Sequence, residues 1–293
     1  MRNERVRASA AKACAIIFVA LLGAAVLTPT GAPAAEKMKP EEVVAKHLEA
    51  IGTAELRAPA RSRVAGGGIE FNIRSGRARR AAGKALLVSE GDKILLNAVF
   101  ETADYPFERM GFDGSKLTLR QFIPGKHSPI GEFILSHEVI FKEGLIGGAL
   151  SSAWPLLNLS GRNPKLEYGG TEKVGGRQAH KLKYGPRKGS DLKITLYFDA
   201  ENFRHVRTKY ERTVAATMGG RPIESAGRID TRYQLVEEFS DFKDEKRLML
   251  PHTYGINFSI SSETNPLTMD WKFSMTQFDF GLAIDAKEFD AVR

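Results

Sequence analysis

The chain has 293 residues, a net charge of +8 and a single cysteine, Cys14. One cysteine cannot form a disulfide framework, so the fold must be stabilised by a hydrophobic core, for which the length is sufficient. The positive charge is mild and is not interleaved with aromatic residues, which argues against a nucleic-acid-binding protein.

Residues 1–34 have the order of a cleavable secretory signal. Basic residues come first, an apolar run from Ala13 to Leu27 follows, and Ala32-Pro33-Ala34 ends the segment. The run holds about 15 residues, fewer than the ~20 needed to span a bilayer. We therefore predict cleavage near Ala34 and a periplasmic protein with no integral membrane segment. Cleavage removes four basic residues and one acidic residue, which leaves a net charge of +5.

A short amphipathic helix is predicted after the signal. Pro40 suits its first turn and Gly52 its end. The side chains that share one face at helical spacing are Val43, Val44, His47, Leu48 and Ile51. We expect this face to lie on an apolar surface of the protein.

From residue 64 the apolar period changes to two, which indicates β-strands. Ile69, Phe71 and Ile73 face one way, as in a half-buried strand. Gly66-Gly67-Gly68 lies in the same strand and lacks the Lys-Ser pair of a phosphate-binding loop. It predicts a bulge or the close approach of another backbone.

Two hairpins are predicted next. Residues 85–100 turn at Glu90-Gly91-Asp92, and both arms are apolar on both faces, so something must cover each side. The second hairpin turns at Asp113-Gly114, with arms at 107–112 and 116–122.

The densest group of basic residues lies between the first two predicted strands. Two interpretations stay open: the group contacts an anionic lipid headgroup, or it is a solvated turn between strands. It consists of Arg74, Arg77, Arg79, Arg80 and Lys84.

Residues 128–160 interrupt the β pattern and predict a helical insertion or lid. Its second half is apolar, rich in small residues and broken by Pro155, which predicts a kinked helix or a buried loop. Trp154 is its largest apolar anchor. The residues at helical spacing are Ile130, Phe133, Ile134, Phe141 and Leu145.

From Lys165 the strand alternation returns and continues almost to the end. Leu196 and Phe198 share a face, and Phe258 and Trp271 belong to later alternating segments. Phe278 follows with changed parity, which predicts a β-bulge. About eleven strands joined by short turns predict a mainly β meander that curls into a barrel or half-barrel, with the helical segments over its concave face.

No catalytic or metal-binding pattern stands out. The sequence lacks G-x-S-x-G, and its six histidines lack H-E-x-x-H or H-x-H spacing. Glu237 and Glu238 lie near a predicted turn, where solvated carboxylates are expected. We therefore predict no catalytic residue, no metal and no cofactor, while a hydrolase with an unrecognised site stays open as an alternative.

Three segments have a distinctive pattern of strands and turns: EEVVAKHLEAIG, TEKVGGRQAHKLKYGPRKGSDLKITLYFDAENFRHVRTKY and FDFGLAIDAKEF. In these segments the chain resembles periplasmic proteins of the outer-membrane lipoprotein-sorting (LolA-like) superfamily. The resemblance implies one domain over residues 35–293, an unclosed antiparallel β-barrel or strongly curved sheet with a helical lid. It also implies an interior that can hold acyl chains.

The leading hypothesis is a periplasmic, non-enzymatic carrier or binder of a lipid or acylated protein. The alternative is an envelope sensor or scaffold that binds a protein partner through the same fold. Arg77, Arg79 and Arg80 are candidates for contact with a headgroup. The candidates for the apolar cavity and lid are Phe71, Phe133, Ile134, Phe141, Leu145, Trp154, Leu196, Phe198, Phe258 and Trp271.

Overall fold

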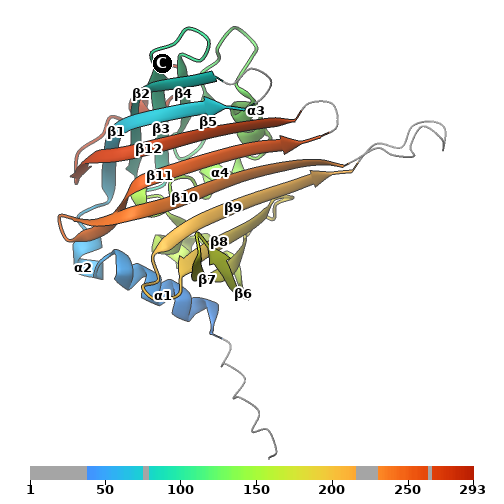
Figure 1. Ribbon diagram of the computed structural model, residues 1–293. Coiled ribbons are helices and arrows are strands. Elements are labelled where there is room, and N and C mark those ends of the chain that lie inside the picture. Colours follow the sequence, from blue (N-terminus) through green and yellow to red (C-terminus); the bar gives the residue numbers. More distant parts are fainter. Residues whose placement is uncertain (1–37, 75–78, 216–229, 263–265) are drawn as a thin grey trace, which may run out of the picture. The chain divides into compact units, whose positions relative to one another are not determined.

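A computed structural model describes residues 38–74, 79–215, 230–262 and 266–293, which form one antiparallel sheet of twelve strands (Figure 1). The strand order is β5-β4-β3-β2-β1-β12-β11-β10-β9-β8-β7-β6. Every pair of neighbours except β1 and β12 is consecutive in the chain, and the edge strands β5 and β6 do not pair with each other. The predicted unclosed, mainly β fold is confirmed, with one strand more than expected.

The strands have the following bounds: β1 Ser62–Ile73, β2 Arg79–Glu90, β3 Lys93–Phe100, β4 Phe107–Phe112, β5 Leu117–Leu119, β6 Lys165–Val174, β7 Arg177–Gly185, β8 Lys193–Asp199, β9 His205–Val214, β10 Thr231–Glu245, β11 Leu248–Ser261 and β12 Leu267–Phe280. The helices are α1 Pro40–Ile51, α2 Ala54–Arg57, α3 Pro129–Ser136, α4 Val139–Lys142 and α5 Leu159–Arg162. Three 3₁₀ turns complete the fold: η1 Gly148–Leu150, η2 Pro155–Asn158 and η3 Ala286–Phe289.

One face of the sheet, called the inner face here, carries the main hydrophobic core. In β12, Met269, Trp271 and Phe273 are buried, whereas Lys272 between them is exposed on the outer face. As the predicted alternation requires, one of every two successive side chains in this strand lies in the core and the next lies on the outer face. Helix α1 packs its buried residues Val43, Val44, His47 and Ile51 beside β11, β6 and η2.

The predicted bulges lie where β1 pairs with β12. Gly66 pairs with Gln277 and Gly67 with Met275, so Thr276 is the extra residue of β12. A Cβ atom on Gly67 would lie 1.9 Å from the carbonyl oxygen of Ser274, so only glycine permits this approach. Both the β-bulge and the close backbone approach are confirmed.

The β2–β3 hairpin is covered on both faces, as predicted. Its inner face joins the main core, and its outer face carries Val88 and Leu95, which pack with Phe289 of η3 and with Ala291. The C-terminal segment therefore covers the apolar outer side of this hairpin. Arg79, Arg80 and Lys84 lie within β2 itself rather than in a turn, which corrects the second interpretation of the basic group.

The insertion between β5 and β6 is helical only in short pieces. Gly144, Gly147 and Gly148 adopt positive φ angles between α4 and η1, where a continuing helix is not possible. The second half is a buried loop with 3₁₀ turns, one of the two forms predicted. Figure 1 shows α4 behind β10 and β11, on one side of the sheet.

The predicted signal peptide and Arg77 lie outside the described residues. Among the residues that are described, no helix is long and apolar enough to cross a membrane.

Candidate ligand-binding site at the open end of the sheet

The inner face holds an apolar hollow at the end of the sheet where β1 ends and β2 and β12 begin. Phe71, Ile73, Ala81 and Met269 come from these strands, and register pairs place Phe71 opposite Ala81 and Ile73 opposite Met269. The hollow has a volume of about 400 Å³, within the range of small-molecule sites. We call it the rim pocket; its remaining walls are Arg79, Arg80, Thr102, Asp104, Tyr105, Phe122 and Pro129.

Aromatic rings hold the rim pocket in shape. Tyr105 stacks on Phe71 with centroids 4.2 Å apart and an interplanar angle of 11°, and Phe122 lies 5.2 Å from Tyr105. Trp271 supports Phe71 from the core at 5.3 Å. Such contacts give the pocket a rigid apolar wall, suited to an apolar ligand.

One ion pair lies at the mouth of the rim pocket. Arg79 is 3.4 Å from Asp104, and both side chains are mostly exposed. An exposed pair of this kind contributes little to stability, so Arg79 can exchange its partner for an anionic ligand group. Arg80 belongs to the outer-facing positions of β2, opposite Asn72.

Beneath the aromatic wall lies a buried acid, Glu108. The hydroxyl of Tyr105 donates to its carboxylate, and Ser128, the N-cap residue of α3, contributes a further hydrogen bond. Burial raises the pKa of Glu108 to about 7, and the two hydrogen bonds oppose this shift. Glu108 therefore connects the wall of the rim pocket with the start of α3.

A second hollow of about 470 Å³ lies on the other side of α3, and Pro129 lines both hollows. Its apolar walls come from Pro129, Phe133, Val214, Tyr233 and Ile260, and its polar walls from Glu132, Ser136, His137, Asp191 and Arg212. We call it the second rim hollow. The first turn of α3 thus separates two openings at the same end of the sheet.

The second rim hollow contains a His–Asp pair. Nδ1 of His137 lies 3.3 Å from Asp191, which is also paired with Arg212. Burial lowers the pKa of His137, and Asp191 opposes the shift. The neighbouring Ser136 hydroxyl donates to the backbone carbonyl of Glu132, so it is not directed at the imidazole.

The interior between α3 and the sheet is filled by side chains. The void found there measures about 10 Å³ and is lined by Ile130, Ile134, Trp271 and Phe273, among others. A void of this size holds at most one water molecule. An acyl chain can therefore enter the interior only if α3 moves.

The second half of the insertion is held by polar side chains. Glu237, on the inner face of β10, accepts hydrogen bonds of 2.7 Å from the Gly147 amide and from the hydroxyls of Tyr210 and Tyr254. The guanidinium of Arg63 donates to the carbonyls of Ala149 and Ser151. These bonds satisfy the backbone groups of a buried loop, so this half is anchored to the sheet.

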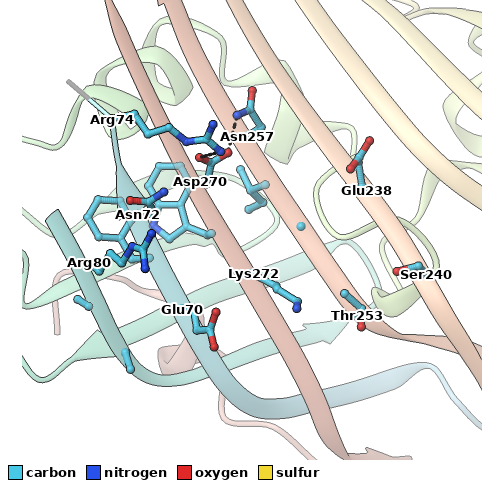
Figure 2. A pocket seen from close by; sticks show the side chains of 16 residues that line it. Glu70, Asn72, Arg74, Arg80, Glu238, Ser240, Thr253, Asn257, Asp270 and Lys272 are labelled. Atoms are coloured by element: carbon cyan, nitrogen blue, oxygen red, sulfur yellow. Dashed lines mark hydrogen bonds and ion pairs between the residues drawn. The ribbon is translucent and has the colours of Figure 1, made fainter. Parts of the chain in front are cut away.

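The outer face has a separate polar hollow of about 790 Å³. Figure 2 shows its labelled side chains extending from β1, β2, β10, β11 and β12. Among its lining residues, Asp270 pairs with Arg74 at 2.8 Å and accepts a 2.6 Å hydrogen bond from Asn257. Small residues such as Ala82 and Gly255 leave room around these groups.

The structure buries all ten apolar residues named as cavity or lid candidates. Phe71 lines the rim pocket, Phe133 lines the second rim hollow, and Ile134 and Trp271 line the interior void. Arg79 and Arg80 lie at the rim pocket with Phe71. The remaining six pack in the core away from these hollows: Phe141, Leu145, Trp154, Leu196, Phe198 and Phe258.

Two of the residues described above were missed or misjudged from the sequence. Glu237 is fully buried, so the expectation of a solvated carboxylate is wrong. The alternation of side chains along the strand indicates this burial, because Leu235 and Phe239, two positions before and after Glu237, face the core. Glu108 shares parity with Met110 and Phe112 in the same way. In the described part of the chain, no cluster of three or more His, Cys, Asp or Glu could hold a metal ion.

Solved structures with a similar arrangement include a LolA superfamily protein from Nitrosomonas europaea, with 13% identity and a TM-score of 0.45, covering 86% of this chain and 97% of that one. A putative outer membrane lipoprotein-sorting protein domain from Vibrio parahaemolyticus has 11% identity and a TM-score of 0.41, covering 84% and 97%. This chain resembles LolA superfamily proteins in its fold.

The MucA/MucB complex of Pseudomonas aeruginosa is also similar, with 9% identity and a TM-score of 0.23, covering 83% of this chain and 100% of that one. No protein-family model matches the chain. No curated protein matches it in sequence.

Proposed function

We propose that the protein is a periplasmic, non-enzymatic binder of a lipid or lipid-modified protein, and that an acyl chain enters at the rim pocket. The observation that carries this proposal is a 400 Å³ hollow with apolar and aromatic walls and an exchangeable arginine at its mouth. Each methylene group buried there contributes about 0.8 kcal/mol, so part of one chain supplies useful affinity.

The location of α3 supports a two-step mode of binding. The rim pocket is open as it stands, whereas the interior beneath α3 is filled. A chain first contacts Phe71, Tyr105 and Met269 at the rim, and longer insertion requires α3 to leave its place. The loop around Gly147 stays attached to the sheet, because Glu237 and Arg63 hold its backbone.

Native mass spectrometry of the protein purified from periplasm tests the proposal, followed by lipid analysis of an organic extract. We expect a bound acyl-containing species whose occupancy falls in Met269→Glu, which places a charge at the wall of the rim pocket. A mass without any adduct, unchanged after incubation with fatty acids and lipopeptides, contradicts the proposal.

A second candidate is an envelope scaffold that binds a protein partner. The filled interior favours it, because side chains occupy the space that a carrier would keep for cargo. The outer polar hollow around Asp270 offers a surface for such a partner. Photo-crosslinking in cells distinguishes the scaffold from the binder. The crosslinker is placed at position 272, on the outer face, or at position 81, in the rim pocket. A protein adduct from position 272 alone favours the scaffold.

A further inference from the structure

The buried acid beneath the wall of the rim pocket links the sheet to α3. Glu108 belongs to β4, and its carboxylate accepts a hydrogen bond from the hydroxyl of Tyr105, which lines the rim pocket. It also shares a hydrogen bond with Ser128, whose hydroxyl accepts from the Gly131 amide in the first turn of α3. One carboxyl group therefore contacts the rim pocket, the sheet and the start of α3.

The surroundings of Glu108 offer no opposite charge within the part of the chain that the structure describes. The residue is 6% exposed and lies opposite Ala98 on β3. Tyr105 stays uncharged, because burial raises the pKa of its hydroxyl well above its ordinary value. A charged carboxylate is strongly disfavoured in such a place. Glu108 borders the filled interior beneath α3, where the other described residues are uncharged: Leu96, Ala98, Met110, Ile130, Ile134, Ile146, Ile256, Trp271 and Phe273.

We propose that Glu108 governs the opening of α3, which stays closed over the uncharged carboxyl group and is released when this group becomes charged. Water reaches the carboxylate once α3 leaves its place, so the open state favours the charged form. In the closed state, burial raises the pKa of Glu108 from 4.5 to about 7. The closed state thus binds the proton more tightly, and the open population increases as the pH rises from 4.5 through about 7.

The role of this opening rests on the proposed function, because longer insertion of an acyl chain requires α3 to move. The rim pocket is accessible whatever the charge of Glu108, whereas the interior is filled while α3 is closed. Glu108 therefore makes access to the interior, rather than first contact at the rim, depend on pH.

Other titratable groups meet α3 at its surface. His127 lies 3.1 Å from Glu132 at the start of the helix, and His137 lies 3.3 Å from Asp191 at its end. Loss of a proton from either imidazole weakens its ion pair, so these contacts also change with pH. None of the four residues lines the filled interior. A substitution at Glu108 therefore separates its effect from theirs.

Hydrogen exchange of the backbone amides, measured by mass spectrometry of peptides at pH 6 and pH 8, tests the proposal on protein without added ligand. Each rate is divided by the intrinsic exchange rate at the same pH. We expect the opening of α3 to increase about tenfold from pH 6 to pH 8, if Glu108 titrates near 7 when α3 is closed and near 4.5 when it is open. Peptides from β12 report global unfolding and should exchange far more slowly than α3 at both pH values.

Glu108→Gln should abolish the increase in α3, because the amide is uncharged at both pH values. Glu237→Gln is the matched control: Glu237 is also buried with a pKa of about 7, but it bonds to the amide of Gly147 rather than to α3, so this variant should keep the increase. Tyr105→Phe serves if Glu108→Gln does not fold. It removes a hydrogen bond that favours the charged form, so the exchange of α3 should keep rising beyond the pH at which the wild type levels off.

Three results would overturn the proposal: exchange of α3 only at the rate of β12, an increase that persists in Glu108→Gln, or a profile of Tyr105→Phe identical to that of the wild type. No acyl ligand is present in this experiment. Its failure therefore leaves the proposed acyl binding to be judged by the adduct measurement, and the absence of an adduct leaves the opening of α3 to be judged by exchange.

Discussion

Glu237 is a carboxylate held away from water by neutral partners. Three donors at 2.7 Å surround it, from Tyr210 on β9, Tyr254 on β11 and the amide of Gly147 in the insertion. Burial raises its pKa from 4.5 to about 7, and the hydrogen bonds only partly oppose this shift. The residue therefore gives the attachment of the insertion a dependence on pH.

The sign of this dependence follows from the raised pKa. The folded state binds the Glu237 proton more tightly, so its contribution to stability is complete below pH 4.5 and is lost as the pH rises through about 7. In the wild type, Glu237 should lower the free energy of unfolding by up to about 3 kcal/mol between pH 4.5 and pH 8. We expect this decrease to be absent in Glu237→Gln. Urea unfolding at both pH values measures it.

Glu238→Gln is the matched control, because Glu238 is the next residue, is mostly exposed and pairs with Arg207 on the outer face. Its effect on the free energy of unfolding should be small and nearly the same at both pH values. A Glu237→Gln variant that follows the wild-type pH profile contradicts the assignment.

His47 is a buried base with a defined tautomer. Its Nδ1 donates to the carbonyl of Phe203 at 3.0 Å, and its Nε2 accepts from the indole of Trp154 at 3.1 Å. Burial lowers its pKa from 6.5 to about 4. The stability that depends on neutral His47 is therefore complete above pH 6.5 and is lost as the pH falls through about 4.

Trp154→Phe tests the link between α1 and the insertion. The ring volume is largely kept, but the hydrogen bond to His47 is lost inside the core. We expect a loss of about 2 kcal/mol in the free energy of unfolding, from the unpaired acceptor and the smaller ring. Chemical denaturation at pH 7 measures it, and a variant as stable as the wild type would show that the bond contributes nothing.

At the scale of elements, the pairing of β1 with β12 depends on glycine at one position. A Cβ atom on Gly67 would meet the Ser274 carbonyl at 1.9 Å, whereas a Cβ atom on the adjacent Gly68 would meet nothing within 4 Å. The two glycines thus differ in what an added side chain would meet.

We expect Gly67→Ala to destabilise the protein by about 3 kcal/mol or more, because two backbones must separate. Gly68→Ala should be neutral or should stabilise by about 0.5–1 kcal/mol, since alanine loses less conformational entropy in a strand. Thermal unfolding of the pair measures both changes. Similar values for the two variants would contradict the register of β1 on β12.

The elements also show which parts of the fold the sequence could reveal. The strand pattern and the bulge after Met275 were predicted, because side-chain parity is a local property of the chain. The sequence alone is compatible with two forms for residues 144–154, a kinked helix or a buried loop, because the partners of this backbone come from distant positions such as Arg63 and Glu237. Likewise, the burial of six candidate lid and strand residues away from any hollow depends on packing between elements.

For the whole molecule, the buried acids and the buried bases change the stability of the fold in opposite directions as the pH changes. Glu108 and Glu237 weaken the fold as the pH rises from 4.5 through about 7, whereas His47 weakens it as the pH falls from 6.5 through about 4. Burial also lowers the pKa of His205 well below its usual value, in the same sense as for His47. We expect the free energy of unfolding to be highest between about pH 5 and 6, as measured by urea unfolding from pH 4 to 8. A free energy of unfolding that stays constant up to pH 8 would contradict the raised pKa values of Glu108 and Glu237.

The central claim is that the rim pocket takes an acyl chain, and two adjacent alanines test it most directly. Ala81 lies in the rim pocket opposite Phe71, whereas Ala82 is exposed on the outer face opposite Glu70. The measurement is titration of the protein with a fluorescent fatty acid, with Ala81→Phe to fill the pocket and Ala82→Phe as its control. We expect Ala81→Phe to weaken binding at least tenfold while Ala82→Phe binds as the wild type does. Equal binding by all three proteins would contradict the claim.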